Sequence, residues 1–287
     1  MILFVWVALL LSCSDVTVEK DAGNVKGPDL GKTDCIGDAQ FGDSNLIEGE
    51  YSYGVMTVVS LNLLHGFPLF SNLDQRTQMV ADMILSLRPD FVAIQEVGQT
   101  PSIANRAQVL AEMTGYEWTW AKASGYAFAF EEGPGVLSRW PIIKTYELEL
   151  PHKGLMGLEI RKVSGVKVQT SHGEAAMFSA HLTTQFEEEV KADQALAAYQ
   201  LAKESTEHIP GFLAGDMNAE PESLAMRFLR GEAIYQEIEA NLQDAWQEAN
   251  PEDPGFTYSA KNPSRRIDYI YVIPWSGGKS RVLECSG

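Results

Sequence analysis

From residue 51 onward, short apolar runs with the length of a strand alternate with segments that have the periodicity of an amphipathic helix. Residues 55–64 and 91–94 are two of these apolar runs. Between them, a helix is expected to start after Ser71 or Asn72 and to end before Pro89. Because some expected strands follow one another directly and others are joined by helices, we predict an α/β fold with mixed sheets flanked by helices.

The remaining elements are expected throughout the rest of the chain. Helices are predicted at residues 103–113, 186–206 and 222–230. Strands are predicted at residues 117–121, 135–138, 143–150, 156–163, 175–180, 212–214, 267–273 and 281–285. No linker or repeat interrupts this stretch, so we expect one domain over residues 51–287.

Five of the apolar strands carry a conspicuous polar residue inside them or at their end. These residues are Asn62, Glu96 after Gln95, His181, Asp216 with Asn218, and Asp268. Each one alone could simply turn the chain or cap a helix. Asp268 is the least ordinary, because an acid among apolar neighbours must be paired or lose solvation at a cost of several kcal/mol. Since strand ends on one side of a sheet converge, the five together predict a functional site.

The types of these side chains restrict the chemistry of that site. Carboxylates and asparagine amides, with a single histidine and no cysteine, are typical ligands of a hard cation that prefers oxygen. We therefore expect Mg²⁺, or Mn²⁺, as the cofactor. Such an ion, with open coordination positions, commonly binds phosphate oxygens.

The order and the sequences of these segments resemble those of the endonuclease/exonuclease/phosphatase family. The segments are LNLLHG, LRPDFVAIQEV, GPGVLSRWPI, FSAHLTT, FLAGDMNAEP and SRRIDYIYV, within residues 54–287. The resemblance implies a four-layer α/β sandwich of two packed mixed sheets with helices outside. It also implies a metal-dependent hydrolase that cleaves a phosphodiester or phosphomonoester by attack of a metal-assisted water.

Roles for individual residues follow from the same resemblance. Asn62 and Glu96 match the metal-binding pair, and Asp216 and Asn218 match residues that position the water and the scissile phosphate. His181 matches the phosphate-contacting histidine of the deoxyribonuclease and sphingomyelinase branches.

Two further roles are implied less directly by the resemblance. Asp268 is expected to orient the imidazole of His181 and to favour its protonated form. Glu131 or Glu132, just before GPGVLSR, is expected to be an accessory acid.

Family members end with Ser-Asp-His, whose histidine is the expected general base, and this sequence contains no Asp-His pair. Two explanations are open: a fragment cut before its natural end, which we favour, or a weakened or inactive enzyme. In either case we expect the activity of the chain as given to be lower by about 10²–10⁴. A surface-anchored binding protein of the same fold is the alternative to an enzyme.

The first fifty residues differ in composition from the rest of the chain. Residues 1–11 are almost entirely apolar and too short to span a bilayer, which predicts a signal peptide over residues 1–13. The sequence LLSC ends at Cys13 and resembles a bacterial lipobox, so we expect lipidation of Cys13. Residues 14–50 are polar and rich in glycine, which predicts a flexible tether. We therefore expect an exported protein of the bacterial cell envelope, lipid-anchored to the membrane or secreted.

Charge limits the partners that the domain could have. The formal net charge of −17 argues against a broad patch for nucleic-acid backbones. Lys261, Arg265 and Arg266 form the one local basic cluster noted in the sequence. Nuclease and sphingomyelinase-type phospholipase C both remain open, and we expect a monomer. Cys35 and Cys285 could pair after export.

Overall fold

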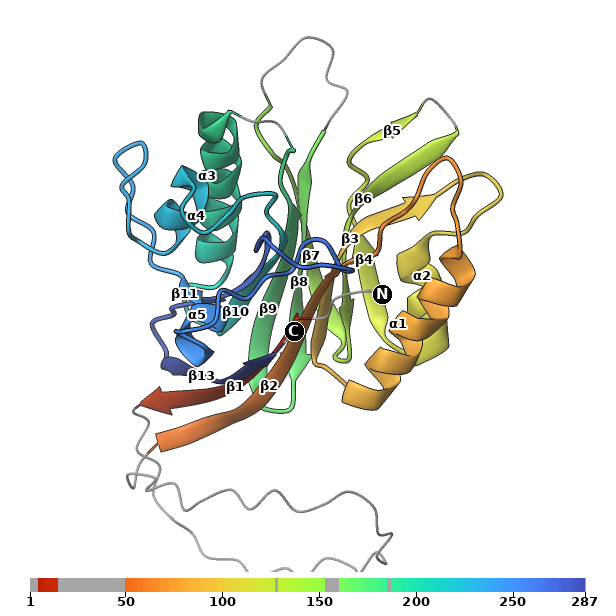
Figure 1. The fold of residues 1–287 in the computed structure, drawn as a ribbon. Coiled ribbons are helices and arrows are strands. Elements are labelled where there is room, and N and C mark those ends of the chain that lie inside the picture. The colour runs from red at the N-terminus through yellow and green to blue at the C-terminus, as the bar shows by residue number, and fades with distance from the viewer. Residues whose placement is uncertain (1–4, 15–49, 127–128, 153–159, 185–186, 287) are drawn as a thin grey trace, which may run out of the picture.

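Two β-sheets lie face to face in the computed structural model, and helices cover the outer face of each (Figure 1). The structure describes residues 5–14, 50–126, 129–152, 160–184 and 187–286. The first sheet has seven strands in the order β13-β1-β2-β3-β6-β4, with β5 beside β6, and the second has six in the order β11-β12-β10-β9-β8-β7. In each sheet one pair of strands is parallel, β2 with β3 and β9 with β10, and the other pairs are antiparallel.

The elements have the following bounds. The first sheet comprises β1 (Val5–Ser14), β2 (Glu50–Asn62), β3 (Phe91–Gln99), β4 (Glu117–Trp120), β5 (Gly125–Tyr126), β6 (Phe130–Ser138) and β13 (Lys279–Ser286). The second comprises β7 (Ile142–Glu149), β8 (Lys162–Thr170), β9 (Gly173–His181), β10 (Gly211–Asp216), β11 (Gln243–Asp244) and β12 (Asp268–Ile273). The helices are α1 (Leu73–Leu87), α2 (Arg106–Thr114), α3 (Glu188–Ser205), α4 (Leu224–Leu229) and α5 (Ala245–Ala249).

Strict alternation of side chains explains how each sheet serves two apolar cores. In β12, Ile270 and Val272 belong to the core between the sheets. Tyr269 and Tyr271 point the other way, into the core under α3 and α4. Successive strand residues face opposite sides of the sheet, so a strand buried on both faces must be apolar throughout. The same alternation determines which way the polar residues at the strand ends point.

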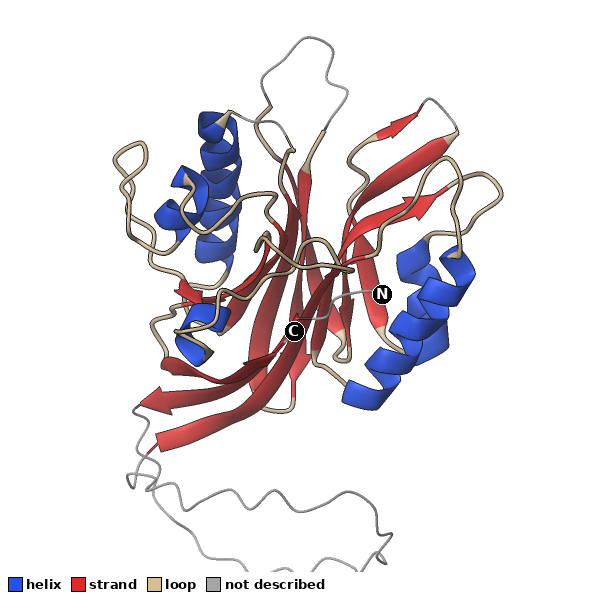
Figure 2. Cartoon of the chain, viewed as in Figure 1, coloured by secondary structure: helices blue, strands red, loops and turns tan. Residues whose placement is uncertain are grey.

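The four-layer sandwich predicted from the resemblance is confirmed, with helices outside the sheets (Figure 2). Helix α2 shows how sequence sets an element that covers a sheet. The Asn105 side chain accepts hydrogen bonds from the N–H groups of Ala107 and Gln108 at its start, and Gly115 ends it with a φ of 75°. Its buried side chain Leu110 packs in the core between the first sheet and the helices α1 and α2.

Most predicted elements occur near their expected positions, but one strand was misplaced. The strand expected at residues 156–163 is wrong in position, because β8 spans Lys162–Thr170, and residues 153–159 lie outside the described part of the chain. Lysine, glutamine and Gly165 interrupt the apolar pattern of β8. A Cβ at Gly165 would lie 2.5 Å from Cδ1 of Phe178, so glycine is needed where this strand passes beneath the ring.

Residues 5–13 of the predicted signal peptide, with Ser14 of the predicted tether, form β1, which lies between β2 and β13. The structure thus gives this segment a place in the uncut chain, and its removal as a leader stays a prediction. Cys13 lies within β1, and residues 15–49 of the predicted tether lie outside the described part of the chain, as does Cys35. Within the described residues, no helix has the length and apolar character needed to cross a bilayer.

Candidate active site

Three neighbouring strands bring three of the predicted residues to the same level at one end of the second sheet. Asp216 ends β10, directly opposite His181 of β9 on one side and Asp268 of β12 on the other. Asp216 follows Phe212 and Ala214, and these two side chains lie in the core between the sheets. Alternation therefore turns Asp216 toward the space between the sheets, where that core ends.

The first sheet contributes Asn62 and Glu96, which a local irregularity brings together. Asn62 ends β2 and lies an even number of residues after Met56 and Val58, which face the core between the sheets. Glu96 departs from the alternation of β3, because the register with β6 shifts between Ile94 and Val97 and its φ is 52°. A bulge of this kind re-aims a side chain. It lets Asn62 Nδ2 donate to Glu96 Oε1 at 3.0 Å.

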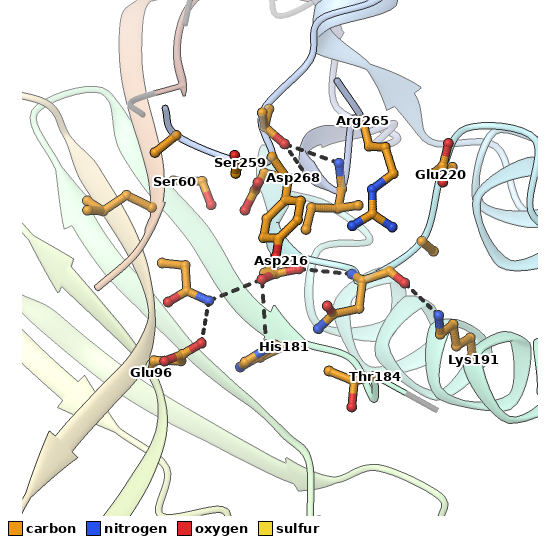
Figure 3. A pocket seen from close by; sticks show the side chains of 18 of the residues that line it. Ser60, Glu96, His181, Thr184, Lys191, Asp216, Glu220, Ser259, Arg265 and Asp268 are labelled. Carbon is orange, nitrogen blue, oxygen red and sulfur yellow. Dashed lines mark hydrogen bonds and ion pairs between the residues drawn. The ribbon is translucent and has the colours of Figure 1, made fainter. Parts of the chain in front are cut away.

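The Asn62 amide is the hub that joins the two sheets at the site (Figure 3). Besides Glu96, its Nδ2 also donates to Oδ2 of Asp216 at 3.1 Å, while its Oδ1 accepts from the N–H of Leu64 at 2.9 Å. Two carboxylates thus converge on one amide nitrogen. Burial, and the nearby charge of Glu96, raise the pKa of Asp216, while its hydrogen bonds from Asn218 and Asn62 oppose the rise.

The His181 ring is buried and held from one side by an arginine that the sequence did not indicate. Arg161 Nη1 lies 2.9 Å from His181 Nδ1. A guanidinium can only donate, so Nδ1 accepts and the proton of the neutral ring is on Nε2. Burial first, and then the charge of Arg161, lower the pKa of His181 well below its ordinary value. This geometry favours the neutral ring, and the protonated form of His181 stays a prediction.

The pairing of His181 with Asp268 is not the one that the structure has. The Nε2 atom of His181 lies 3.8 Å from Oδ2 of Asp216, which is too long for a hydrogen bond. Asp268 lies one strand further along, beyond Asp216. Burial and the charge of Asp216 raise the pKa of Asp268 to about 7, and a side-chain hydrogen bond with Thr257 opposes the rise.

Of the two predicted accessory acids, Glu132 is the one connected to the site. Glu132 is buried, and its Oε1 lies 3.8 Å from Arg161 Nη1, the same nitrogen that contacts His181. Glu131 instead pairs with Lys122 and accepts from Gln99 Nε2 at 2.6 Å. The carboxylate of Glu132 therefore balances the charge that Arg161 brings into a buried place.

Asn218 is fixed by a tight turn that follows β10. Its φ is 47°, and its N–H donates to Asp216 Oδ1 at 2.9 Å, while its Nδ2 donates to the carbonyl of Leu182 at 3.0 Å. Gly215 precedes the turn with a φ of 147°, and a Cβ there would lie 1.9 Å from the carbonyl oxygen of Ala180. Only glycine allows β10 to approach β9 this closely.

His65 lies in the loop after β2 and contacts a predicted metal ligand. Its backbone N–H donates to Glu96 Oε2 at 3.1 Å, and its Nε2 lies 3.4 Å from the same oxygen. Its Nδ1 accepts from the N–H of Phe67 at 2.9 Å, and its ring packs 4.6 Å from that of Phe130. The position of His65 in an ordinary loop sequence gave no signal of this contact.

One cavity of about 1250 Å³ unites most of these groups. Its lining includes all six residues predicted to be catalytic or metal-binding, namely Asn62, Glu96, His181, Asp216, Asn218 and Asp268, and also Arg161. Glu131 and Glu132 are not part of its lining. The arrangement offers carboxylates, amides and a neutral imidazole around a single space, which suits a ligand with several oxygen atoms.

Solved structures provide comparisons for the fold. An endonuclease/exonuclease/phosphatase family protein from Leptotrichia buccalis C-1013-b has 19% identity and a TM-score of 0.61, covering 76% of this chain and 88% of that one. Humanized D. rerio TDP2 has 17% identity and a TM-score of 0.58, over 76% and 83% of the two chains. Mannosyl-6-phosphatase Bt3783 from Bacteroides thetaiotaomicron VPI-5482 has 18% identity and a TM-score of 0.53, over 70% and 77%.

No curated protein matches the sequence of this chain. Residues 59–274 match the model of the endonuclease/exonuclease/phosphatase family, a stretch that contains all six of the predicted catalytic and metal-binding residues. Since this match spans well over half of the sequence, the chain belongs to the endonuclease/exonuclease/phosphatase family.

Proposed function

We propose that this protein hydrolyses a phosphoester, a diester or a monoester, with the help of a divalent cation. The observation that carries the proposal is the convergence of Asn62, Glu96, Asp216 and His181 on one cavity from both sheets. The family membership supports the same reaction class, and one structural neighbour is a mannosyl-6-phosphatase.

The donor atoms at the site fit a hard cation such as Mg²⁺ or Mn²⁺. Glu96 and Asp216 both accept from the Asn62 amide. Two carboxylates therefore lie close together, and the donor that they share is neutral. Among the described residues, no group of three or more His, Cys, Asp or Glu side chains could hold a metal ion. A small number of protein ligands is enough for Mg²⁺, because the bound ion keeps several of its waters. Asn62 and Glu96 would hold the ion, which would offset phosphate charge and ease deprotonation of the attacking water.

The protein's own groups then have distinct tasks. The Nε2–H of His181 has no hydrogen bond to Asp216 at 3.8 Å, so it is placed to donate to a phosphate oxygen. Asp216 has its Oδ1 fixed by the Asn218 N–H, and its pKa is raised, which suits a carboxylate that orients water and accepts its proton. Arg161, behind His181, adds positive charge where negative charge grows in the transition state.

A single substitution tests the proposal. The replacement Glu96→Gln keeps the size of the side chain and removes its charge, so it should lower Mg²⁺-dependent hydrolysis of bis(p-nitrophenyl) phosphate by roughly 10²-fold or more. The control is Glu220→Gln, which removes an exposed carboxylate that lines the same cavity. Equal activity of Glu96→Gln and the unchanged protein, or full activity with excess chelator, would overturn the proposal.

We also propose that the protein is exported and held at the membrane by a lipid on Cys13. The apolar run before Cys13 supports this, and the acidic composition is compatible with a domain that is only tethered to the surface. Processing at Cys13 would remove most of β1. The mass of the mature protein and its detergent partition test this. A protein that keeps residues 1–12 and stays in the aqueous phase would refute the anchor.

A further inference from the structure

Helix α3 carries two polar side chains that reach the ends of the strands beside it. Lys191 and Gln194 lie three residues apart, so they are on the same side of the helix. Gln194 is fully buried: its Oε1 accepts from the N–H of Thr183 at 2.8 Å, and its Nε2 donates to the carbonyl oxygen of Pro151 at 2.9 Å. Gln194 thereby holds the segment that follows His181 at the end of β9.

Lys191 makes the corresponding contact with the turn after β10. Its Nζ donates to the carbonyl oxygen of Asn218 at 2.6 Å (Figure 3). A hydrogen bond from an ammonium group is charge-assisted and stronger than one between neutral groups. Both Lys191 and Asn218 line the cavity, so this contact belongs to the site.

The turn at Asn218 has a conformation that its surroundings must hold. Its φ of 47° lies in the left-handed region, which is uncommon for a residue other than glycine and persists only where neighbouring groups fix it. The N–H of Asn218 donates to Asp216 Oδ1, and its Nδ2 donates to the carbonyl oxygen of Leu182. Those two bonds join the turn to the strand ends, and the bond from Lys191 joins it to α3.

The helix that provides this lysine is held independently of the site. The buried side chains of α3 include Ala195, Leu196 and Tyr199, which belong to the core between the second sheet and the helices α3 and α4. Side chains on packed helices are placed more precisely than side chains on loops. Lys191 therefore connects the turn at Asn218 to a part of the fold whose position the site does not determine.

We propose that Lys191 is a positioning residue, which holds the turn after β10 so that Asp216 and Asn218 keep their orientation toward the reacting groups. The inference rests on the proposed function, in which these two residues act on the water and the phosphate. It adds a residue on a helix to a site built from strand ends. A shift of about 1 Å in such groups can lower a rate by about 10²-fold, although the residue that moves them never touches the substrate.

Two lysines of the same helix provide a matched pair of variants. Lys203 is half-buried like Lys191, and its Nζ donates to the carbonyl oxygen of Pro274 at 2.5 Å, but it does not line the cavity. Lys191→Met and Lys203→Met both keep an apolar side chain and remove one bond from a lysine to a carbonyl oxygen. They should therefore lower the midpoint of urea denaturation by similar amounts. Only Lys191→Met should lower kcat for Mg²⁺-dependent hydrolysis of bis(p-nitrophenyl) phosphate, by roughly 10- to 10²-fold.

The two kinetic constants distinguish positioning from simple attraction of the substrate. A misplaced turn weakens interactions made in the transition state, so kcat should fall in Lys191→Met while KM changes by less than about threefold. Lys191→Arg can still donate to the carbonyl oxygen of Asn218 and should recover most of kcat. A loss confined to KM would show that Lys191 acts as a binding charge, and an equal loss of kcat in Lys203→Met would show an effect of stability. Either result would overturn the inference.

Amide hydrogen exchange separates the failure of this inference from failure of the proposed function. The N–H of Asn218 is bonded to Asp216 Oδ1 at 2.9 Å, so its exchange rate, followed by NMR, reports on the turn without any substrate. We expect this rate to rise about tenfold in Lys191→Met and to stay unchanged in Lys203→Met. If the rates differ in this way but no ester is hydrolysed, the proposed function fails while Lys191 still fixes the turn. Equal exchange rates in Lys191→Met and the unchanged protein would overturn the inference, whatever the protein hydrolyses.

Discussion

Replacing Asp268 by asparagine should make the folded protein more stable at neutral and alkaline pH. The pKa of this carboxyl rises from 3.8 to about 7 on folding, mainly through burial and the charge of Asp216. Below the pKa of the unfolded state, the carboxyl of Asp268 is protonated in both states, so no charge has to be buried. As the pH rises toward the folded value, the unfolded chain releases its proton first, so the wild-type protein loses stability.

The size of the effect follows from the shift. A change from 3.8 to about 7 corresponds to roughly 4 kcal/mol when the pH is well above 7, at about 1.4 kcal/mol per pKa unit. Asp268 is partly exposed and lines an open cavity, so screening by solvent reduces this to about 2–4 kcal/mol. An asparagine is never ionised and avoids this cost at every pH.

Urea denaturation of both proteins in the presence of a chelator measures this difference. The free energies of unfolding should nearly agree at about pH 4 and diverge by about 2–4 kcal/mol at about pH 8. Glu220→Gln, which changes a more exposed carboxylate of the same cavity, should show no such divergence. If Asp268→Asn is less stable than wild type at pH 8, Asp268 is ionised and favourably paired, and the reasoning is refuted.

Three more predictions concern the frame of the site. Gly215→Ala should destabilise the protein by about 3 kcal/mol or more in urea denaturation, because its Cβ would lie 1.9 Å from the carbonyl oxygen of Ala180; a loss under 1 kcal/mol would contradict this close approach. Asn105→Ala should cost about 1 kcal/mol in the same assay, through loss of the cap of α2, and an unchanged midpoint would contradict the cap. Arg161→Gln should raise the pKa of His181 part of the way to its usual value in an NMR titration, since burial remains; no change would show that Arg161 does not contribute.

The site could be predicted from the sequence wherever a polar residue interrupts a run of buried apolar ones. Asp216 and Asp268 are conspicuous for this reason, because an acid in a buried strand adds no apolar surface to the core. Arg161 gave no such signal, since it precedes β8, whose own pattern is mixed. Arg161 and His181 meet because β8 pairs with β9 in the second sheet, and this strand pairing cannot be read from either local sequence.

The fold was predictable to a similar extent and failed for a similar reason. The apolar strands after residue 50 and the long helices were found, while β1 was not expected as a strand and β8 was misplaced. The elements β5, β11 and α5 were missed because they are short or weakly patterned. The pairing expected between Asp268 and His181 was wrong because strand order decides it. With β10 between β9 and β12, Asp216 occupies the position next to both.

The Asn62 hub has a consequence for how the protein becomes active during folding. Its partners Glu96 and Asp216 come from different sheets, and the site as a whole draws on residues from 62 to 268. Contacts so far apart in sequence form late, because loop-closure entropy must be overcome before they give any stability. A collapsed intermediate with complete strands but undocked sheets would lack the site. Recovery of activity after dilution from denaturant should therefore coincide with the last and slowest phase of refolding.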